Sequence, residues 1–233
     1  MGKWILVMDS GIGGIWTLNC LQKHMPSENF LFFMDKLNAP YGNKPFEQLN
    51  KIVAKNVKKI REKYQIKMIV LACNTVSCVC YDRLKEQNAD LPIVKIQPQV
   101  DIKKFAGKPT LILATDNTAK FSKVVLEVSK ETNVFVESFG TLAKQIDENQ
   151  DNFDAILPFL EQNLSKYKQM HIQNIVLGCT HYNFIRPQLK RIFGNVIFFE
   201  SSDEVAKECK NILKKSNMLK DNDIGSTITF CEI

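Results

Sequence analysis

Two cysteines, Cys73 and Cys179, stand at equivalent places in two similar stretches of the chain. The first stretch reads Ile66-Lys-Met-Ile-Val-Leu-Ala-Cys-Asn-Thr, and the second reads Ile172-Gln-Asn-Ile-Val-Leu-Gly-Cys-Thr-His. A thiol pKa near about 8.5 allows one cysteine to be a thiolate while its partner remains a proton-donating thiol. Two such groups on opposite walls of a cleft can remove a proton from one face of a carbon and return one to the other face, which inverts a stereocentre.

Each cysteine has a candidate helper of a different kind. His181 lies two residues beyond Cys179, and its imidazole can carry a proton to or from that thiol. Asp9 ends a strand that we expect beside the strand carrying Cys73. Because a nearby carboxylate raises the pKa of a thiol, Asp9 would act as a proton acceptor or as the ligand of an ammonium group. The sequence leaves both roles open.

The remaining cysteines are better explained as small core residues with reduced thiols than as disulfides, since no secretory signal is visible. They are Cys20, Cys78, Cys80, Cys209 and Cys231. Cys78 and Cys80 lack the second Cys-x-x-Cys pair or the spaced histidines that would complete a zinc site, so we expect no metal. Neither Cys73 nor Cys179 has a Cys-x-x-Cys partner, which disfavours a thiol redox protein.

Short apolar runs rich in β-branched and aromatic residues alternate with longer amphipathic segments along the whole chain. This pattern is typical of parallel sheets that helices cover on both faces, so we expect an α/β fold. The expected strands are residues 4–8, 30–34, 68–72, 93–96, 111–114, 134–136, 175–178 and 196–199.

The repetition extends beyond the cysteines, because the same offset of 106 residues aligns Ile5-Leu-Val-Met-Asp-Ser with Leu111-Ile-Leu-Ala-Thr-Asp. It predicts two similar domains, residues 1–96 with about 207–233 and residues 97–206, each with a parallel-strand-rich sheet flanked by helices. A pseudo-twofold axis would relate them, and the helix-like stretch 203–215 would pack back on the first. Ligands of open parallel sheets bind beyond the carboxyl ends of the strands. We therefore expect the active site in the cleft between the domains.

The glycine-rich segment Asp9-Ser-Gly-Ile-Gly-Gly follows an expected strand and resembles a dinucleotide-binding loop, but its spacing misses Gly-x-Gly-x-x-Gly. Its amides can instead hold a substrate carboxylate at a helix N-terminus. No other cofactor motif is visible, although a lysine that binds pyridoxal stays open. We expect cofactor-independent chemistry that relies on positioned hydrogen bonds in a water-poor cleft.

Length and composition bound the class of protein. The chain has 233 residues, of which 45% are hydrophobic and 24% charged, as in an ordinary globular protein. Its net charge of +6 is spread over amphipathic stretches such as 51–63, without a zinc-finger or RNA-recognition pattern, so we expect no nucleic-acid partner. No signal peptide or membrane-spanning apolar run is visible. We expect a cytoplasmic protein with no membrane partner.

Four segments together resemble the motifs of bacterial glutamate racemase, within the superfamily of cofactor-independent aspartate and glutamate racemases. They span most of the chain: Asp9-Ser-Gly-Ile-Gly-Gly, Pro40-Tyr-Gly-Asn-Lys-Pro, Ala72-Cys-Asn-Thr and Gly178-Cys-Thr-His-Tyr. The resemblance implies an isomerase that interconverts L- and D-glutamate without a cofactor. It also implies that Cys73 acts on the D-isomer and Cys179 on the L-isomer.

The resemblance further implies which residues contact glutamate. These are Asp9, Ser10, Pro40, Tyr41, Gly42, Asn74, Thr75, Thr180 and His181, and Ala-Thr-Asp-Asn-Thr adds Thr115 and Thr118. Their hydroxyl and amide groups suit two carboxylates and an ammonium group. A homodimer is expected from the frequency of dimers among enzymes. D-glutamate from such an enzyme would supply peptidoglycan biosynthesis, and so cell wall biogenesis and cell shape.

Some segments depart from the family pattern. Asn183 follows Tyr182 where the family usually has proline, and residues 139–147 lack the usual Cys-Pro and proline-rich run. Asp147 would replace a glutamate that the family uses near its second cysteine. Two alternatives therefore stay open: a racemase for aspartate or another acidic amino acid, and a catalytically idle relative that acts as a binding protein. The segment Pro40-Tyr-Gly favours glutamate.

Overall fold

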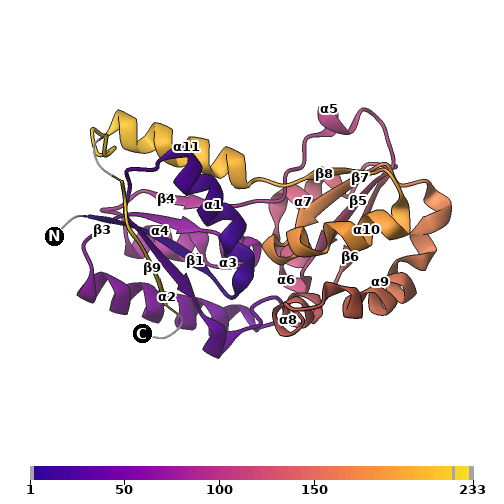
Figure 1. The fold of residues 1–233 in the computed structure, drawn as a ribbon, viewed down its shortest axis with the longest axis horizontal. Coiled ribbons are helices and arrows are strands. Elements are labelled where there is room, and N and C mark those ends of the chain that lie inside the picture. The colour runs from indigo at the N-terminus through magenta and orange to yellow at the C-terminus, as the bar shows by residue number, and fades with distance from the viewer. Residues whose placement is uncertain (1–2, 222–223, 231–233) are drawn as a thin grey trace.

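In the computed structural model the chain forms two α/β lobes side by side, each built around its own sheet (Figure 1). The structure describes residues 3–221 and 224–230, so Cys231 lies outside the described residues. The first lobe contains the start of the chain and its last described strand, and the second contains the middle of the chain.

The first sheet has the strand order β4-β3-β1-β2-β9, and each strand is parallel to its neighbours. Its central strands are apolar on both faces because helices cover both sides, as the uninterrupted apolar runs predict. The strands are β1 (Trp4–Asp9), β2 (Phe30–Met34), β3 (Ile66–Leu71), β4 (Ile93–Lys95) and β9 (Thr227–Phe230).

The second sheet has the order β6-β5-β7-β8 and is also parallel. Its strands are β5 (Thr110–Ala114), β6 (Val134–Ser138), β7 (Asn174–Gly178) and β8 (Ile197–Phe199). In chain order β5 to β8 correspond to β1 to β4, and the two sheets then have the same strand order. The α/β fold and all eight expected strands are confirmed. The ninth strand, β9, was not predicted, since its four residues alternate threonine with apolar side chains in a largely exposed edge strand.

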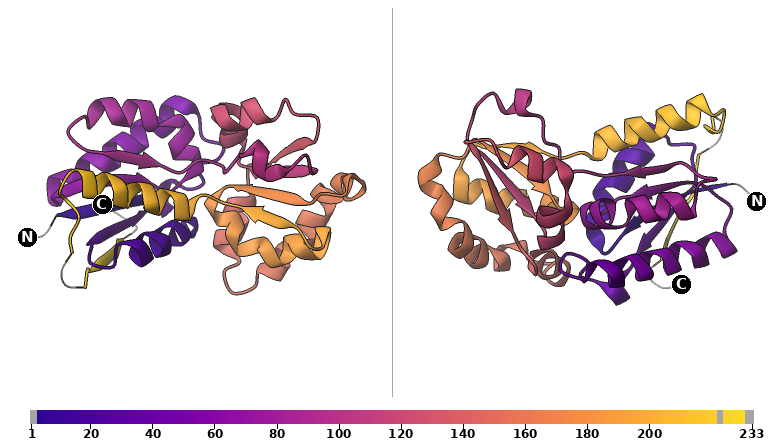
Figure 2. Two further views of the ribbon diagram at one scale, coloured as in Figure 1. Left: turned by 90° about the horizontal axis from the view of Figure 1, so that it is seen from above. Right: turned by 180° about the vertical axis from the view of Figure 1, so that it is seen from behind.

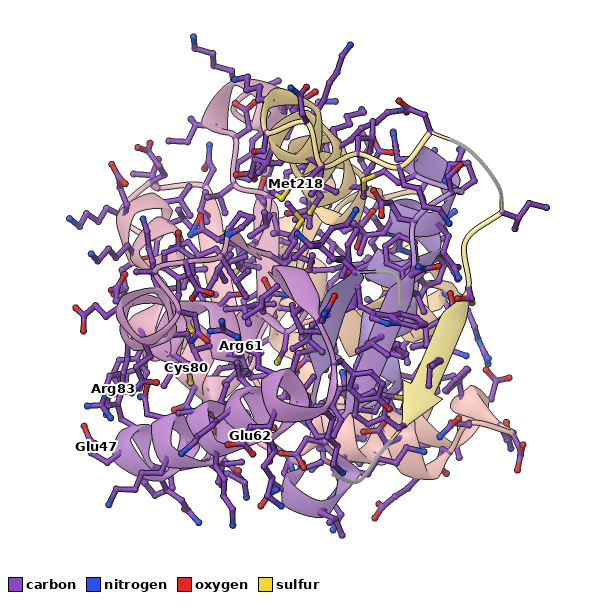
Figure 3. The ribbon with its side chains drawn as sticks, turned by 90° about the vertical axis from the view of Figure 1, so that its left-hand side faces the viewer. Glu47, Arg61, Glu62, Cys80, Arg83 and Met218 are labelled. Atoms are coloured by element: carbon purple, nitrogen blue, oxygen red, sulfur yellow. The ribbon has the colours of Figure 1, made fainter. Side chains whose placement is uncertain are left out.

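Helices cover both faces of the first sheet. On one face lie α2, α3 and α4, whose apolar side chains form a core with β1 and β3, and on the other lie α1 and α11. Glu47 of α2 pairs with Arg83 of α4 on the outer surface, with Nη1 and Oε2 3.1 Å apart (Figure 3). The helices are α1 (Ile15–His24), α2 (Phe46–Lys63), α3 (Asn74–Val79), α4 (Tyr81–Gln87) and α11 (Ser202–Lys215).

The second sheet is covered in the same manner. Helices α8, α9 and α10 pack on one face, and α5 and α7 on the other. The helices are α5 (Ile102–Phe105), α6 (Asp116–Phe121), α7 (Lys123–Val128), α8 (Leu142–Glu148), α9 (Leu157–Leu164) and α10 (Arg186–Phe193). Short 3-10 helices complete the chain: η1 (Ile12–Gly14), η2 (Lys36–Asn38), η3 (Phe153–Ile156), η4 (Ser165–Met170) and η5 (Thr180–Ile185).

Two extensive contacts between the lobes exchange the roles of the halves. Helix α3, which follows β3, contacts α6, which follows β5, while η1 after β1 contacts η5 after β7. Because β1 corresponds to β5 and β3 to β7, each contact is the counterpart of the other. Such reciprocal contacts characterise an interface with twofold symmetry, here between two halves of one chain.

Two connections run between the lobes, one after β4 and one after β8, and the views of Figure 2 show them close together. The hydroxyl of Ser201 in the second connection donates a hydrogen bond to the carbonyl of Gln97 in the first. After this crossing α11 packs on α1, where Ser202 and Thr17 hydroxyls lie 3.1 Å apart. We propose that residues 3–96 with 202–221 and 224–230 form one domain and 97–201 the other, because a boundary near 207 would divide α11.

None of the helices among the described residues is both long enough and apolar enough to span a bilayer.

Candidate active site

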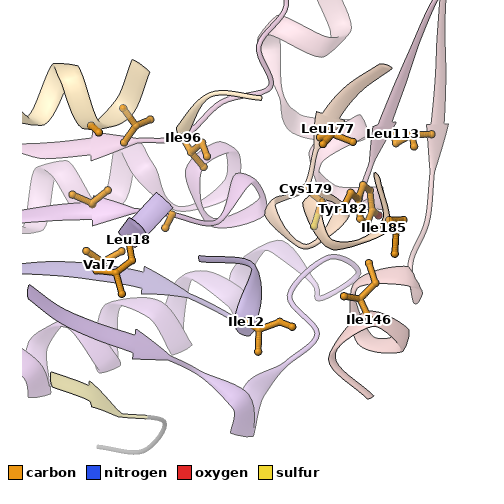
Figure 4. Packing of buried hydrophobic residues seen from close by; sticks show 14 of the residues in the cluster. Val7, Ile12, Leu18, Ile96, Leu113, Ile146, Leu177, Cys179, Tyr182 and Ile185 are labelled. Atoms are coloured by element: carbon orange, nitrogen blue, oxygen red, sulfur yellow. The ribbon is translucent and has the colours of Figure 1, made fainter. Parts of the chain in front are cut away.

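Cys73 and Cys179 begin the segments that follow the equivalent strands β3 and β7. Each is the N-cap residue of its helix with extended backbone, and each side chain is only 6% exposed. Figure 4 shows Cys179 on the part of the second lobe that faces the first, across from Ile12. Both thiols therefore lie at the carboxyl edges of the sheets, where the two lobes meet.

Asp9 joins the lobes at this edge. Its Oδ2 accepts a hydrogen bond of 2.9 Å from the Thr180 hydroxyl of the second lobe. Its Oδ1 accepts from the amide of Ser10 at 2.6 Å and from that of Gly11 at 3.3 Å, and the Ser10 hydroxyl lies 3.3 Å from the same oxygen. β1 pairs with β3 as expected, which places Asp9 beside the strand that leads to Cys73.

Burial shifts the protonation of both groups on this wall. Desolvation raises the pKa of Asp9 to about 6, although His181 and the hydrogen bond from Thr180 favour its charged form. The pKa of Cys73 is raised well above its ordinary value, first by burial and then by the charges of Asp9 and Cys179. The first wall thus holds a protonated thiol beside a carboxyl group that changes charge near neutral pH.

The second wall contains a chain of three polar side chains. Cys179 Sγ lies 3.8 Å from His181 Nδ1, and His181 Nε2 lies 3.2 Å from both carboxylate oxygens of Asp147. Burial opposes charge on His181, but the hydrogen bonds to Asp147 and Cys179 and the charge of Asp9 raise its pKa well above the ordinary value. The ring is thus held between an acid and a thiol, where it can transfer a proton.

Asp147 of α8 also reaches across to the first lobe. Its Oδ1 accepts a hydrogen bond of 3.2 Å from the amide of Ile12. Burial alone would raise the pKa of Asp147, but the hydrogen bonds and charge of His181 and the Ile12 amide hold it below its ordinary value. Aspartate is one methylene shorter than the glutamate expected at this position, but it still reaches His181 because α8 packs closely on η5.

The amides of the glycine-rich segment, which we expected to hold a substrate carboxylate, bind side chains of the protein instead. The amides of Ser10 and Gly11 donate to Asp9 and the amide of Ile12 donates to Asp147, so three of them hold carboxylates of the protein itself. A Cβ at Gly13 would lie 2.5 Å from both the Thr180 hydroxyl and His181 Nδ1. Glycine is thus required there for the close approach of η1 and η5.

Three threonine hydroxyls form a cluster on the other contact between the lobes. Thr115 Oγ1 lies 2.9 Å from Thr75 Oγ1 and donates to Thr118 Oγ1 at 2.9 Å, while Thr75 and Thr118 lie 3.5 Å apart. All three side chains are buried. Thr115 is also the counterpart of Asp9 in the repeat, so both first strands end in a group that bonds the opposite lobe.

The buried side chain of Asn74 follows Cys73 directly, and its Oδ1 has no hydrogen-bond partner among the described residues. A buried amide oxygen without a partner costs stability unless a ligand or water supplies a donor. Asn74 therefore offers a buried hydrogen-bond acceptor next to the Cys73 thiol.

The segment Pro40-Tyr-Gly contacts the second lobe through Gly42. The phenol group of Tyr41 points back into the first lobe. The Tyr41 hydroxyl donates to Asp35, whose Oδ2 also accepts 2.8 Å from Asn56 within the first lobe. A Cβ at Gly42 would lie 2.9 Å from Thr115 Cβ. Half-buried Pro40 precedes them. A contact of Tyr41 or Gly42 with substrate would therefore use the backbone.

Sequence reasoning missed two residues that organise the site. Asp35 orients Tyr41, and Asn117 binds the Tyr41–Lys44 turn through its side-chain amide. Asn117 stood inside the quoted segment Ala-Thr-Asp-Asn-Thr, but only the pairing of the two lobes reveals its partners. Among the described residues no group of three or more His, Cys, Asp and Glu side chains could hold a metal ion.

The fold and this constellation have relatives among known proteins. No family model matches the chain. A glutamate racemase of Clostridium botulinum (strain Kyoto / Type A2) is 36% identical over 237 residues, which cover 98% of this chain and 91% of the relative.

Solved structures show the same fold. The Escherichia coli glutamate racemase in complex with L-glutamate and the activator UDP-MurNAc-Ala has a TM-score of 0.84 at 22% identity, covering 98% of this chain and 89% of the other. The Francisella tularensis enzyme in complex with D-glutamate has a TM-score of 0.81 at 24% identity, covering 98% and 87%. An aspartate racemase of Picrophilus torridus is more distant, with a TM-score of 0.55 at 15% identity, covering 93% and 95%.

The extent and identity of the Clostridium match agree with the paired cysteines at equivalent strand ends. The chain belongs to the glutamate racemase family.

Proposed function

We propose that the chain interconverts L- and D-glutamate with Cys73 and Cys179 as the two proton-transferring groups. The observation that carries this proposal is the placement of the two thiols at equivalent strand ends of two lobes that face each other. The activity of relatives that match nearly the whole chain supports the choice of glutamate.

In the L-to-D direction the thiolate of Cys179 removes the α-proton and becomes a thiol. Cys73 then donates its own proton to the opposite face of the carbanion and becomes a thiolate. One C–H bond breaks and one forms, so the substrate gains no net proton. The enzyme returns to its starting state when the proton on Cys179 is exchanged for one on Cys73, and His181 and Asp9 are the groups placed to assist.

The raised pKa of Cys73 fits this assignment. Without substrate, burial and the charge of Asp9 keep this thiol protonated, as a donor must be. A substrate ammonium group paired with Asp9 would offset the carboxylate's charge and make the thiolate of Cys73 more accessible for the reverse reaction. Asp9 would then serve as a ligand of the substrate ammonium group. The two carboxylates, and the ammonium group together with Asp9, would be bound by neighbouring polar side chains: Asn74, Thr75, Thr115, Thr118 and Thr180.

The lobes must separate for a substrate to enter. Both thiols are almost fully buried, and hydrogen bonds from Thr180 and Thr75 close the contact between the lobes. The groove of about 670 Å³ between α2 and α4, where Arg61 and Glu62 appear in Figure 3, is lined by neither cysteine. The two adjacent connections joined by Ser201 and Gln97 are a natural hinge.

Initial rates with purified protein test the proposal and its alternatives. L-glutamate, D-glutamate and L-aspartate are supplied separately without cofactor, and the product enantiomer is quantified by chiral chromatography. Formation of the opposite glutamate isomer supports the proposal. Turnover of aspartate with none of glutamate would identify an aspartate racemase, and glutamate binding without turnover would identify an idle relative.

We further propose that the enzyme acts in the cytoplasm as a homodimer, supplying D-glutamate for peptidoglycan. Both thiols come from one chain, so dimerisation would not be needed to complete the site. Sedimentation equilibrium tests the dimer.

A further inference from the structure

Asn117, in the second lobe, binds three backbone carbonyls of one turn in the first lobe. Its Nδ2 donates to Tyr41 O at 3.1 Å and to Lys44 O at 2.9 Å. The backbone amide of Asn117 donates to Gly42 O at 2.8 Å. The side chain is 8% exposed, so water does not replace these bonds easily.

These bonds fix the direction of two peptide groups. In a planar trans peptide the carbonyl and the following N–H point in opposite directions. Since the carbonyls of Tyr41 and Gly42 point at Asn117, the amides of Gly42 and Asn43 point away from it. No hydrogen bond between described residues uses either amide. The turn therefore presents two free donors whose orientation depends on Asn117.

A second set of contacts holds the same turn in place. Gly42 packs directly on Thr115 of the hydroxyl cluster, where a Cβ would be 2.9 Å from Thr115 Cβ. The ring centroids of Phe46 and Phe121, one from each lobe, lie 5.6 Å apart just beyond the turn. The turn is thus seated on α6 beside the cleft and can move away only when the lobes separate.

We propose that Asn117 is a positioning residue for substrate binding: it seats the Tyr41–Lys44 turn on α6 when the lobes close, and so aims the amides of Gly42 and Asn43 at a substrate carboxylate. This inference rests on the proposed racemase function. It predicts that Asn117 acts on binding of both isomers alike, because the groups that the turn presents are backbone amides, which transfer no proton to or from the α-carbon.

Steady-state kinetics of Asn117→Ala and Asn117→Asp test the inference. The aspartate variant keeps the shape but cannot donate to the Tyr41 and Lys44 carbonyls. A matched control is Asn174→Ala, since buried Asn174 also donates twice, to Phe105 O and Thr110 Oγ1, but entirely within the second lobe. We expect KM to rise about ten-fold for both isomers in both Asn117 variants, with kcat changed less than about three-fold and KM unchanged in the control.

An equal effect on KM in Asn117→Ala and Asn174→Ala would overturn the inference, as would a normal KM in Asn117→Asp. If the Asn117 variants do not fold, the unaltered protein still decides. The backbone amide resonances of Gly42 and Asn43 should then shift on saturation with D-glutamate, and unshifted resonances would contradict the role. Absence of turnover by the unaltered protein would instead refute the proposed function.

Discussion

The hydroxyl of Thr180 in the second lobe donates a 2.9 Å hydrogen bond to the carboxylate of Asp9 in the first. On the other contact between the lobes Thr115, which is the counterpart of Asp9 in the repeat, has its hydroxyl 2.9 Å from that of Thr75. The two walls of the site are thus similar in architecture but differ in charge. The first has a carboxyl group beside Cys73, and the second has an imidazole beside Cys179.

Replacing either cysteine of the pair should abolish racemisation. Cys73→Ser and Cys179→Ser each remove an acid or base whose loss typically costs 10²- to 10⁴-fold, so we expect kcat/KM to fall by at least about 10³. Cys78→Ser is the control, because its Sγ donates to the backbone carbonyls of Thr75 at 3.3 Å and Asn117 at 3.7 Å, and a serine hydroxyl can do the same. Chiral chromatography measures the rates. Similar losses in all three variants would point to a structural role for the thiols.

Asp9→Asn should change how stability depends on pH. The native pKa of Asp9 is raised from 3.8 to about 6, so the folded state binds more protons than the unfolded state between these values. The wild type should therefore lose up to about 3 kcal/mol of unfolding free energy between pH 4 and 6.5, relative to Asp9→Asn. Urea unfolding across this range measures the difference. Parallel pH curves for the two proteins would contradict the buried, protonated form of Asp9.

Asp147→Asn should lower the pKa of His181. In the wild type burial lowers that pKa, but the hydrogen bond to Asp147, followed by the hydrogen bond and charge of Cys179 and the charge of Asp9, raises it well above 6.5. Without the hydrogen bond to Asp147, burial is opposed less and the neutral ring becomes more favourable. NMR titration of the His181 imidazole should show the variant ring losing its proton at a lower pH than the wild-type ring. An unchanged titration would mean that Asp147 does not set its charge. His24, paired with Asp203, provides a resonance that the variant should leave unshifted.

Gly13→Ala should separate the lobes at η1 and η5. The new Cβ would lie 2.5 Å from the Thr180 hydroxyl and from His181 Nδ1, so kcat/KM should fall at least about 100-fold as catalytic groups are displaced. Gly107→Ala is the control. That residue has a φ of 70° with nothing within 4 Å of an added Cβ, so it should lose about 1–2 kcal/mol of stability and keep activity. Equal activities in the two variants would contradict the close packing.

The apolar strands were predictable because burial on both faces leaves a continuous run in the sequence. The equivalent positions of Cys73 and Cys179 were also predictable, because the constant offset of the repeat aligns whole strands of the two halves. Strand β9 could not be predicted, because half of its residues are threonine and the strand adds to the sheet only at its edge, next to β2.

Site residues that act through the pairing of the lobes were harder to predict. Asp147 is brought to His181 and to the Ile12 amide from a different helix, and no spacing in the sequence reports this. Asn117 is similar, since its partners lie more than 70 residues earlier in the chain. Tyr41 shows the converse. Its motif was visible, but the tertiary structure directs its hydroxyl to Asp35.

The most direct test of two-thiol inversion is the fate of the α-proton in deuterium oxide. L-glutamate is incubated with the enzyme without cofactor, and α-deuterium in each enantiomer is quantified during the first few per cent of conversion. Two separate thiols predict that newly formed D-glutamate carries deuterium at the α-carbon, while the remaining L-glutamate is almost free of it. D-glutamate that retains the original α-proton would contradict the account, as would the absence of both exchange and inversion.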